Sequence, residues 1–246
     1  MKPMALIVLS ITVAFAFLGG FGSRGALARQ SPAEGQSVEK LPPDIHPESL
    51  SRMPRTKRDE LATDEEKAAF DRVAAMSPTV AATKGVLGPT GTRAQIPELA
   101  ESYRNMFNML TKKCGVEQKY FELAVLVATR ESNNEVEWND HEPNGIKLLG
   151  PEVVEMIRNK QDPKGLEEKE ALTIQYGREV FHQPRVSSKT FADMERNFGR
   201  KGTLGIALIV GYYTANAMLM HTYDQHTDPN RKRPFADVVA MDAKNH

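Results

Sequence analysis

The stretch EVEWNDHEP, residues 135–143, gathers side chains that can move protons. Glu137 and His141 are four residues apart, so they share one face if the segment is helical. Glu122 lies upstream in the apolar run YFELAVLVATR, where a carboxylate beside a core needs a partner. A turn near Asn133 would fold the two segments into an antiparallel pair and bring all three side chains together. Because histidine titrates near neutral pH and a desolvated glutamate is raised toward it, the trio is suited to general acid–base catalysis.

Structural interpretations compete with this one. Asn134 followed by Glu137 is a variant of the capping box, which would use the carboxylate on backbone donors at a helix start. His141 could be a surface imidazole paired with a nearby acid. A closed pocket around the trio would favour an enzyme. A capping Glu137 with His141 in solvent would favour a non-catalytic binding or structural protein.

A metal site is a further alternative, because two carboxylates and a histidine can bind zinc or iron. However, the helical motif of di-iron bundles spaces Glu and His three apart, and HEPNG has Gly145 where HExxH has its second histidine. His221 and His226 follow the last expected helix and are interpreted as part of a solvated tail. The sequence also contains no phosphate-cradling glycine motif and no nucleophile elbow. We expect no metal and no cofactor.

Two residues that occur once are ambiguous. Trp138, the only tryptophan, is expected either to wall a substrate pocket or to pack in the core. Cys114 is the only cysteine, so no intramolecular disulfide can form. We interpret Cys114 as a small buried residue and assign it no catalytic role.

The elements that must position these residues are all helical. Apolar residues recur three and four apart, and no alternating run of strand length appears. The first helix is expected in TDEEKAAFDRVAAM with Thr63 or Asp64 as its cap, and a loop is expected from Leu87 to Pro97. Segments with helical spacing follow at 96–113, 118–132, 135–150, 151–160, 166–183, 187–199 and 203–223.

The chain divides into four parts by composition. Lys2, an apolar run from Met4 to Leu18 and small residues before a cut after Ala28 predict a signal peptide at 1–28, with an uncleaved anchor as the alternative. Residues 29–60 are polar and proline-rich, as is typical of an extended arm. The helical domain is expected at 61–225 and a polar tail at 226–246. The protein is therefore expected to be secreted or periplasmic.

Charge and hydropathy limit the partners. The 246 residues carry 32 basic and 32 acidic side chains, which gives no electrostatic case for nucleic acid. The uncharged stretch 204–220 is slightly short for a membrane span and contains Thr214 and Asn216. We expect a central buried helix there, no stable membrane span after signal removal, and a candidate subunit interface.

The order Glu122, Glu137, Trp138 and His141, followed by Pro143 and a Gly-Pro step at residue 150, resembles the carboxymuconolactone decarboxylase family. The phrases FELAVLVATRESNNEVEWNDHEP and LEEKEALTIQYGREVFHQPRVSSKTFADMERNFGRKGTLGIALIVGYYTANAML carry the resemblance, which runs from about residue 52 to 220. It implies an all-α, alkylhydroperoxidase D-like domain that associates into trimers or hexamers.

The resemblance also bears on chemistry. The redox branch of the family has a CxxC pair at the positions of Asn134 and Glu137, and thiol–disulfide exchange requires both sulfurs, so peroxidase activity is not expected. In the decarboxylase-like branch, the residues at the positions of Glu122, Glu137 and His141 are the expected acid–base set.

The function expected from all of this is a cofactor-independent lyase or isomerase that acts on a small cyclic carboxylic acid or lactone. Arg130 or Arg93 could hold the carboxylate of such a substrate, although each is equally consistent with a structural charge.

Overall fold

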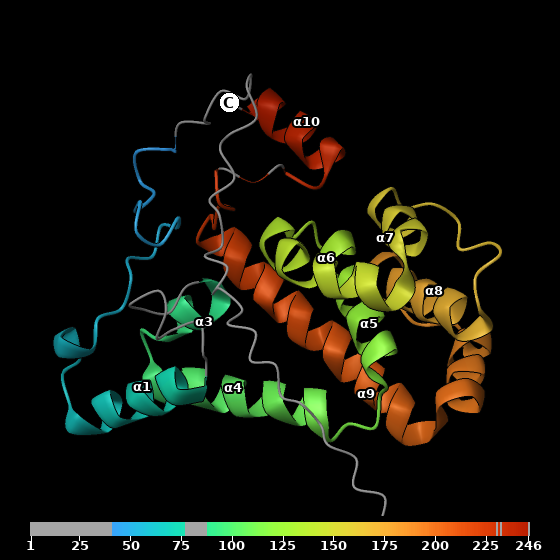
Figure 1. The fold of residues 1–246 in the computed structure, drawn as a ribbon, viewed down its shortest axis with the longest axis horizontal. Helices are drawn as coiled ribbons and strands as arrows, with labels where there is room; N and C mark the ends of the chain where they lie inside the picture. Colours follow the sequence, from blue (N-terminus) through green and yellow to red (C-terminus); the bar gives the residue numbers. More distant parts are fainter. Residues whose placement is uncertain (1–40, 77–87, 230, 232, 246) are drawn as a thin grey trace, which may run out of the picture. The chain divides into compact units, whose positions relative to one another are not determined.

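The computed structural model of the protein describes residues 41–76, 88–229, 231 and 233–245. The expected signal peptide and the first part of the expected arm lie outside these residues. Within them, all regular elements are helices (Figure 1), with a single isolated bridge between His46 and Ser51. The expectation of an all-α fold is confirmed.

Most helices follow the predicted segments. In chain order the helices are the 3-10 turn η1 (Arg58–Glu60), α1 (Asp64–Met76), α3 (Gly88–Arg93), α4 (Pro97–Lys112), α5 (Gln118–Glu131), α6 (Glu135–Leu149), α7 (Pro151–Arg158), α8 (Glu168–His182), α9 (Ser188–Thr222) and α10 (Ala236–Asn245). However, α9 joins the two segments expected at 187–199 and 203–223, and α3 and α10 were not expected.

Helix starts are set by local chemistry. Thr63 caps α1: its hydroxyl accepts from the backbone N–H of Glu66, whose carboxylate accepts from the N–H of Thr63, so the two form a capping box. Ser187 caps α9 by accepting from the N–H of Thr190. The loop expected from Leu87 to Pro97 instead contains the short helix α3, whose second residue, Pro89, is tolerated because a first-turn residue needs no N–H donor.

Helix α5 is the centre of the domain. All of its residues from Tyr120 to Glu131 are buried because α6, α8 and α9 pack around it. One glycine in α6 and one in α8 allow these two helices to approach α5 closely. A Cβ added at Gly145 of α6 would lie 2.4 Å from Leu126, and one added at Gly177 of α8 would lie 2.4 Å from Val127.

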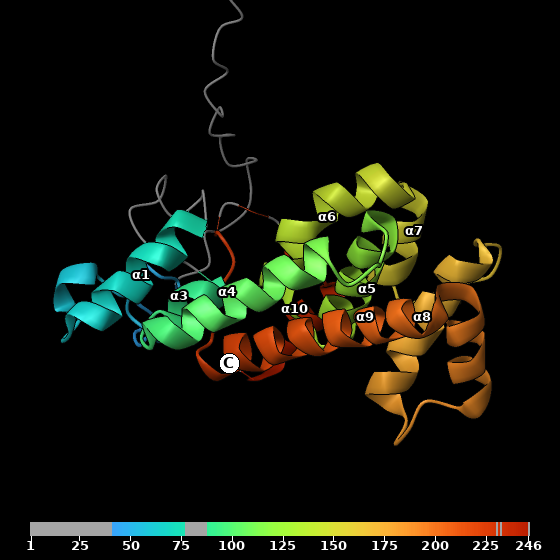
Figure 2. The same cartoon turned by 90° about the horizontal axis from the view of Figure 1, so that it is seen from below.

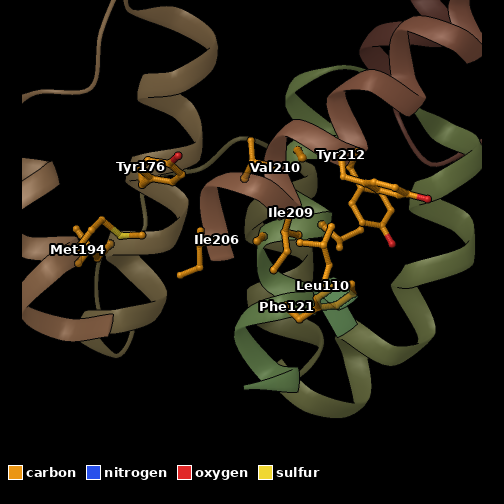
Figure 3. Packing of buried hydrophobic residues seen from close by; sticks show 13 residues of the cluster. Leu110, Phe121, Tyr176, Met194, Ile206, Ile209, Val210 and Tyr212 are labelled. Atoms are coloured by element: carbon orange, nitrogen blue, oxygen red, sulfur yellow. The ribbon is translucent and has the colours of Figure 1, made fainter. Parts of the chain in front are cut away.

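The core has two principal clusters on either side of α5. The first joins α4, α5, α8 and α9, and its extent is seen in Figure 3, where Met194 and Tyr176 lie at one end and Tyr212 at the other. The second contains Trp138, residues of α7 and, from the C-terminal segment, Phe235. The acid–base residues described below lie on the helices that these clusters hold together.

Helix α9 is bent at Gly199, whose φ of 65° departs from helical geometry and is open to glycine without strain. By length and composition α9 is apolar enough to cross a membrane, and 56% of its most apolar window is buried inside the fold. Figure 2 shows α4 running beside it.

The ends of the described chain differ from expectation. Residues 226–246 were expected to form a polar tail, but they include α10, and Phe235 is 1% exposed in the second cluster. Part of the expected arm is also tied down: Ser51 and Arg52 both donate to the carbonyl of Tyr223, and the N–H of His226 donates to Leu50. These contacts fix the segment against the end of α9.

Candidate acid–base site

The structure brings Glu122, Glu137 and His141 together. His141 Nδ1 lies 2.7 Å from Glu122 Oε2, and His141 Nε2 lies 3.8 Å from Glu137 Oε2. The two carboxylate side chains are 3% and 9% exposed, and the imidazole is 15% exposed. The antiparallel arrangement of α5 and α6 produces this convergence, since Glu122 comes from the first and the other two from the second.

Glu122 is held from several directions. Gln118 donates to its Oε1 at 2.9 Å, and Asn144 approaches the same oxygen at 3.5 Å. Its other oxygen bonds His141 Nδ1. An ionised carboxylate can only accept, so this bond places a proton on Nδ1 and orients the ring.

The other ring nitrogen of His141 is also engaged. Tyr213 of α9, which is 1% exposed, has its hydroxyl 2.9 Å from His141 Nε2. The two rings meet edge to face, with centroids 5.0 Å apart. Tyr213 was not among the site residues predicted from the sequence. The available signal was a tyrosine in an otherwise apolar helix, because a buried phenol usually finds a hydrogen-bond partner.

Glu137 is connected to α3 through α9. Asn216 donates to Glu137 Oε1 at 2.9 Å, and its own amide oxygen accepts from the Arg93 guanidinium at 2.5 Å. Arg93 is 7% exposed and lies over the ring of Tyr103, 3.9 Å from its centroid. Arg93, one of the two arginines considered as substrate anchors, is therefore part of this network.

Glu137 takes part in the helix cap only through its backbone N–H. The side chain of Asn134 accepts from the N–H of Glu137 at 3.2 Å and so caps α6. The Glu137 carboxylate instead bonds Asn216 on α9. The carboxylate thus belongs to the buried polar network rather than to the helix cap.

Burial and charge shift the acidities of the site. Burial raises the pKa of Glu137, opposed by the charge of His141. Burial alone would lower the pKa of His141, but the hydrogen bond to Glu122 and the charge of Glu137 outweigh it, so the pKa of His141 is raised. Burial likewise raises the pKa of Tyr213 well above its ordinary value of 10.0. All three groups therefore keep their protons to higher pH than they would in water.

The remaining predicted residues lie elsewhere. Arg130 donates to the Arg158 carbonyl at 2.6 Å and to Asp237 at 2.7 Å, and it lies over the Phe235 ring. Trp138 has no exposed surface and packs edge to face against Phe235, with centroids 5.1 Å apart. Both residues surround Phe235 in the second cluster. Contact of either with a substrate stays a prediction.

A cleft of about 580 Å³ lies beside Arg130 rather than at the trio. It is bordered by residues of α5, α6, α7, the turn after α7 and the C-terminal segment, most of them charged or polar: Arg130, Glu142, Glu155, Arg158, Asn159, Lys160, Arg233, Pro234, Ala236 and Asp237. Its arginines are bonded to neighbouring carboxylates, including Arg158 to Glu142 and Arg233 to Glu135. The cleft is consequently a neutralised surface feature, separate from the acid–base residues.

Cys114 is partly buried, and its thiol donates to the carbonyl of Leu110. In the part of the chain that the structure describes, no group of three or more His, Cys, Asp or Glu side chains is arranged to hold a metal ion. No protein-family model matches the chain, and no curated protein matches it either.

Proposed function

We propose that this protein is a cofactor-independent lyase or isomerase that uses Glu122, His141 and Glu137 on a small cyclic carboxylic acid or lactone. The observation that carries the proposal is the imidazole of His141 bonded to one buried carboxylate and adjacent to a second. Titratable groups with shifted pKa values that share one site are typical of acid–base catalysis.

The chemistry requires a group that supplies a proton to a carbanion. Loss of carbon dioxide from a conjugated acid, or removal of a proton beside a carbonyl, leaves an electron pair on the substrate that must be reprotonated. An imidazolium stabilised by Glu122 is the proposed source of that proton, and burial raises the pKa of Glu137 toward the range in which it could also donate. Burial of both carboxylates limits competition from water.

Arg93 is the better of the two candidate substrate anchors. Arg130 already pairs with Asp237, whereas among the described residues the Arg93 guanidinium donates a hydrogen bond only to the neutral Asn216. Burial lowers the pKa of Arg93, which reflects the cost of holding a buried cation. A substrate carboxylate would offset that cost and would lie close to Glu137, which Asn216 also bonds.

The resemblance to the decarboxylase-like branch of the carboxymuconolactone decarboxylase family supports the same assignment. In that branch these positions hold the acid–base set, and the all-α fold agrees with it at the level of class. Export and the substrate class remain parts of the proposal.

The test is a screen of lactones and unsaturated cyclic acids with no metal added and then with chelator. We expect wild-type turnover in both conditions and a loss of about 100- to 10,000-fold in kcat/KM for His141→Ala, the usual worth of a positioned general acid. His182→Ala is the matched control, because His182 also bonds a glutamate, Glu131, but is 56% exposed. Activity that disappears with chelator and returns with zinc or iron would favour a metal-dependent enzyme instead.

A non-catalytic oligomeric protein is the second candidate function. An exposed apolar face on α9 favours assembly of several copies under both candidate functions. The outer face of α9 exposes Leu204, Leu208 and Met218 at 59%, 49% and 54%. With Gly211 and Ala215 these residues follow alternating steps of four and three, the spacing of helix–helix seams. We propose that this face joins copies of the chain into a trimer or hexamer, as the resemblance implies. A catalytically silent protein that still assembles would favour the second candidate.

A further inference from the structure

Neither ring nitrogen of His141 is free to touch a substrate. Nδ1 is 2.7 Å from Glu122 and Nε2 is 2.9 Å from the Tyr213 hydroxyl. Since Glu122 fixes a proton on Nδ1, a neutral imidazole accepts at Nε2 from the phenol, and an imidazolium donates at Nε2 to the phenol oxygen. In both states the group at the end of this chain of bonds is Tyr213.

We propose that Tyr213 is the residue that delivers the proton to the substrate, with His141 as the proton reservoir and Glu122 as the group that orients it. This inference rests on the proposed function and assigns the last step of proton delivery within the same site. Its basis is the order Glu122, His141, Tyr213 along two consecutive hydrogen bonds.

The hydroxyl lies on the same side of the imidazole as Glu137. Both Tyr213 and Glu137 approach the same nitrogen, Nε2 of His141. Glu137 is linked through Asn216 to Arg93, the proposed carboxylate anchor. A ligand held at Arg93 would therefore meet Glu137 and Tyr213 on that side. The imidazole, 15% exposed, stays in contact with solvent.

The step balances as a two-proton transfer. When carbon dioxide leaves, the electron pair of the broken C–C bond remains on the substrate carbon. That carbon takes the phenolic proton of Tyr213, and the phenol oxygen takes the Nε2 proton of the His141 imidazolium in the same movement. His141 is left neutral and regains a proton from solvent, so one solvent proton is consumed for each carbon dioxide released.

The electrostatic surroundings favour a phenol that donates over a phenolate that removes protons. Burial and nearby negative charge raise the pKa of Tyr213 well above its ordinary value, so it stays protonated through the neutral range. Glu122, Glu137, Tyr212 and Arg104 act on Tyr213 through their charges, and His141 contacts its hydroxyl. Asp140 acts on its neighbours His141 and Glu137, and Arg93 acts on Glu137.

The first measurement compares Tyr213→Phe with wild type on a compound that the screen identifies. Phenylalanine keeps the ring contacts with His141, Phe121 and Tyr212 and removes only the hydroxyl. We expect kcat to fall about 100- to 10,000-fold with little change in KM. Tyr176→Phe is the control, because Tyr176 is buried in the same cluster at the end far from Tyr212 (Figure 3).

The double variant separates a relay from independent roles. Adding Tyr213→Phe to His141→Ala should cause no further loss beyond about threefold, since residues that act as one unit are not additive. If Tyr213→Phe kept turnover within threefold of wild type, the donor role of Tyr213 would be overturned. The proposed function would still stand. Absence of wild-type turnover across the screen would overturn the proposed function and the donor role with it.

A second measurement needs no substrate. In full-length protein labelled with ¹⁵N-histidine, the His141 signal is assigned from a His141→Gln spectrum and titrated. Tyr213→Phe removes the acceptor of the imidazolium Nε2–H, so we expect the pKa of His141 to fall by about one unit. A pKa that stays the same would show that the two groups are not coupled in solution and would overturn the relay.

Discussion

Asn216 donates a 2.9 Å hydrogen bond to the buried carboxylate of Glu137 and thereby ties α9 to α6. The other end of the same amide accepts from Arg93 of α3. One neutral side chain thus satisfies a buried acid and a buried base that are not bonded to each other. Both charged groups are only 7% exposed, so Asn216 links a buried acid and a buried base inside the fold and connects α9 to α6 and α3.

Replacing the Asn216 side chain should lower the stability of the fold. Asn216→Ala removes the bond partner of two buried ionisable groups, so we expect the free energy of unfolding to fall by about 2–4 kcal/mol. The loss should be larger at pH 8 than at pH 5, because a protonated Glu137 needs the donor less. Denaturant unfolding at the two pH values measures both effects. Asn197→Ala on the same helix, where the amide bonds the exposed Glu168, should change stability by less than about 0.5 kcal/mol.

The raised pKa values of Glu137 and His141 make a prediction about stability and pH. A group whose folded pKa lies above its unfolded value stabilises the fold below the unfolded pKa and loses that contribution as pH rises through the folded pKa. For Glu137 the loss begins near its ordinary value of 4.5, and for His141 near 6.5. These two groups should therefore make the protein less stable at pH 8 than at pH 5.

Glu137→Gln tests this linkage, because glutamine keeps the size and can still accept from Asn216. We expect the variant to show a weaker pH dependence than wild type and to match or exceed its stability at pH 8. Thermal unfolding between pH 5 and pH 8.5 is the measurement. A variant that lost stability equally at every pH would indicate that Glu137 contributes through packing, without a buried titration.

Most helix positions and the members of the trio could be predicted from sequence because both rest on local spacing, whereas α3 and α10 were not predicted. The four-residue step from Glu137 to His141 and the apolar run around Glu122 are visible in the chain itself. The contribution of α9 was not predicted, since Tyr213 and Asn216 lie far along the sequence from Glu137 and only packing brings them near. The burial of Phe235 was not predicted for the same reason, because it depends on contacts with the distant Trp138 and Arg130 rather than on its own polar neighbours in sequence.

The close approach of α6 to α5 should be sensitive to a single methyl group. Gly145→Ala would place a Cβ 2.4 Å from Leu126, and such overpacking costs typically about 1–3 kcal/mol. Because α6 carries His141, turnover should fall together with stability. Lys147→Ala, at an exposed position of the same helix, is the control, since it removes no buried contact and alanine favours the helix. Equal stability of the two variants would contradict the packing described for Gly145.

The exposed seam of α9 gives the last prediction. Leu208 lies between Leu204 and Gly211 on that face, and a glutamate there would bring like charges together wherever two copies meet. We expect Leu208→Glu to reduce the molar mass in light scattering at micromolar concentration from an oligomer to a monomer, with the helical content retained. Val180→Glu, on α8 and 40% exposed, makes the same chemical change on another surface and should leave the mass unchanged. A wild-type protein that is already monomeric at this concentration would contradict the seam. An oligomer that tolerates Leu208→Glu but not Val180→Glu would move the interface to α8.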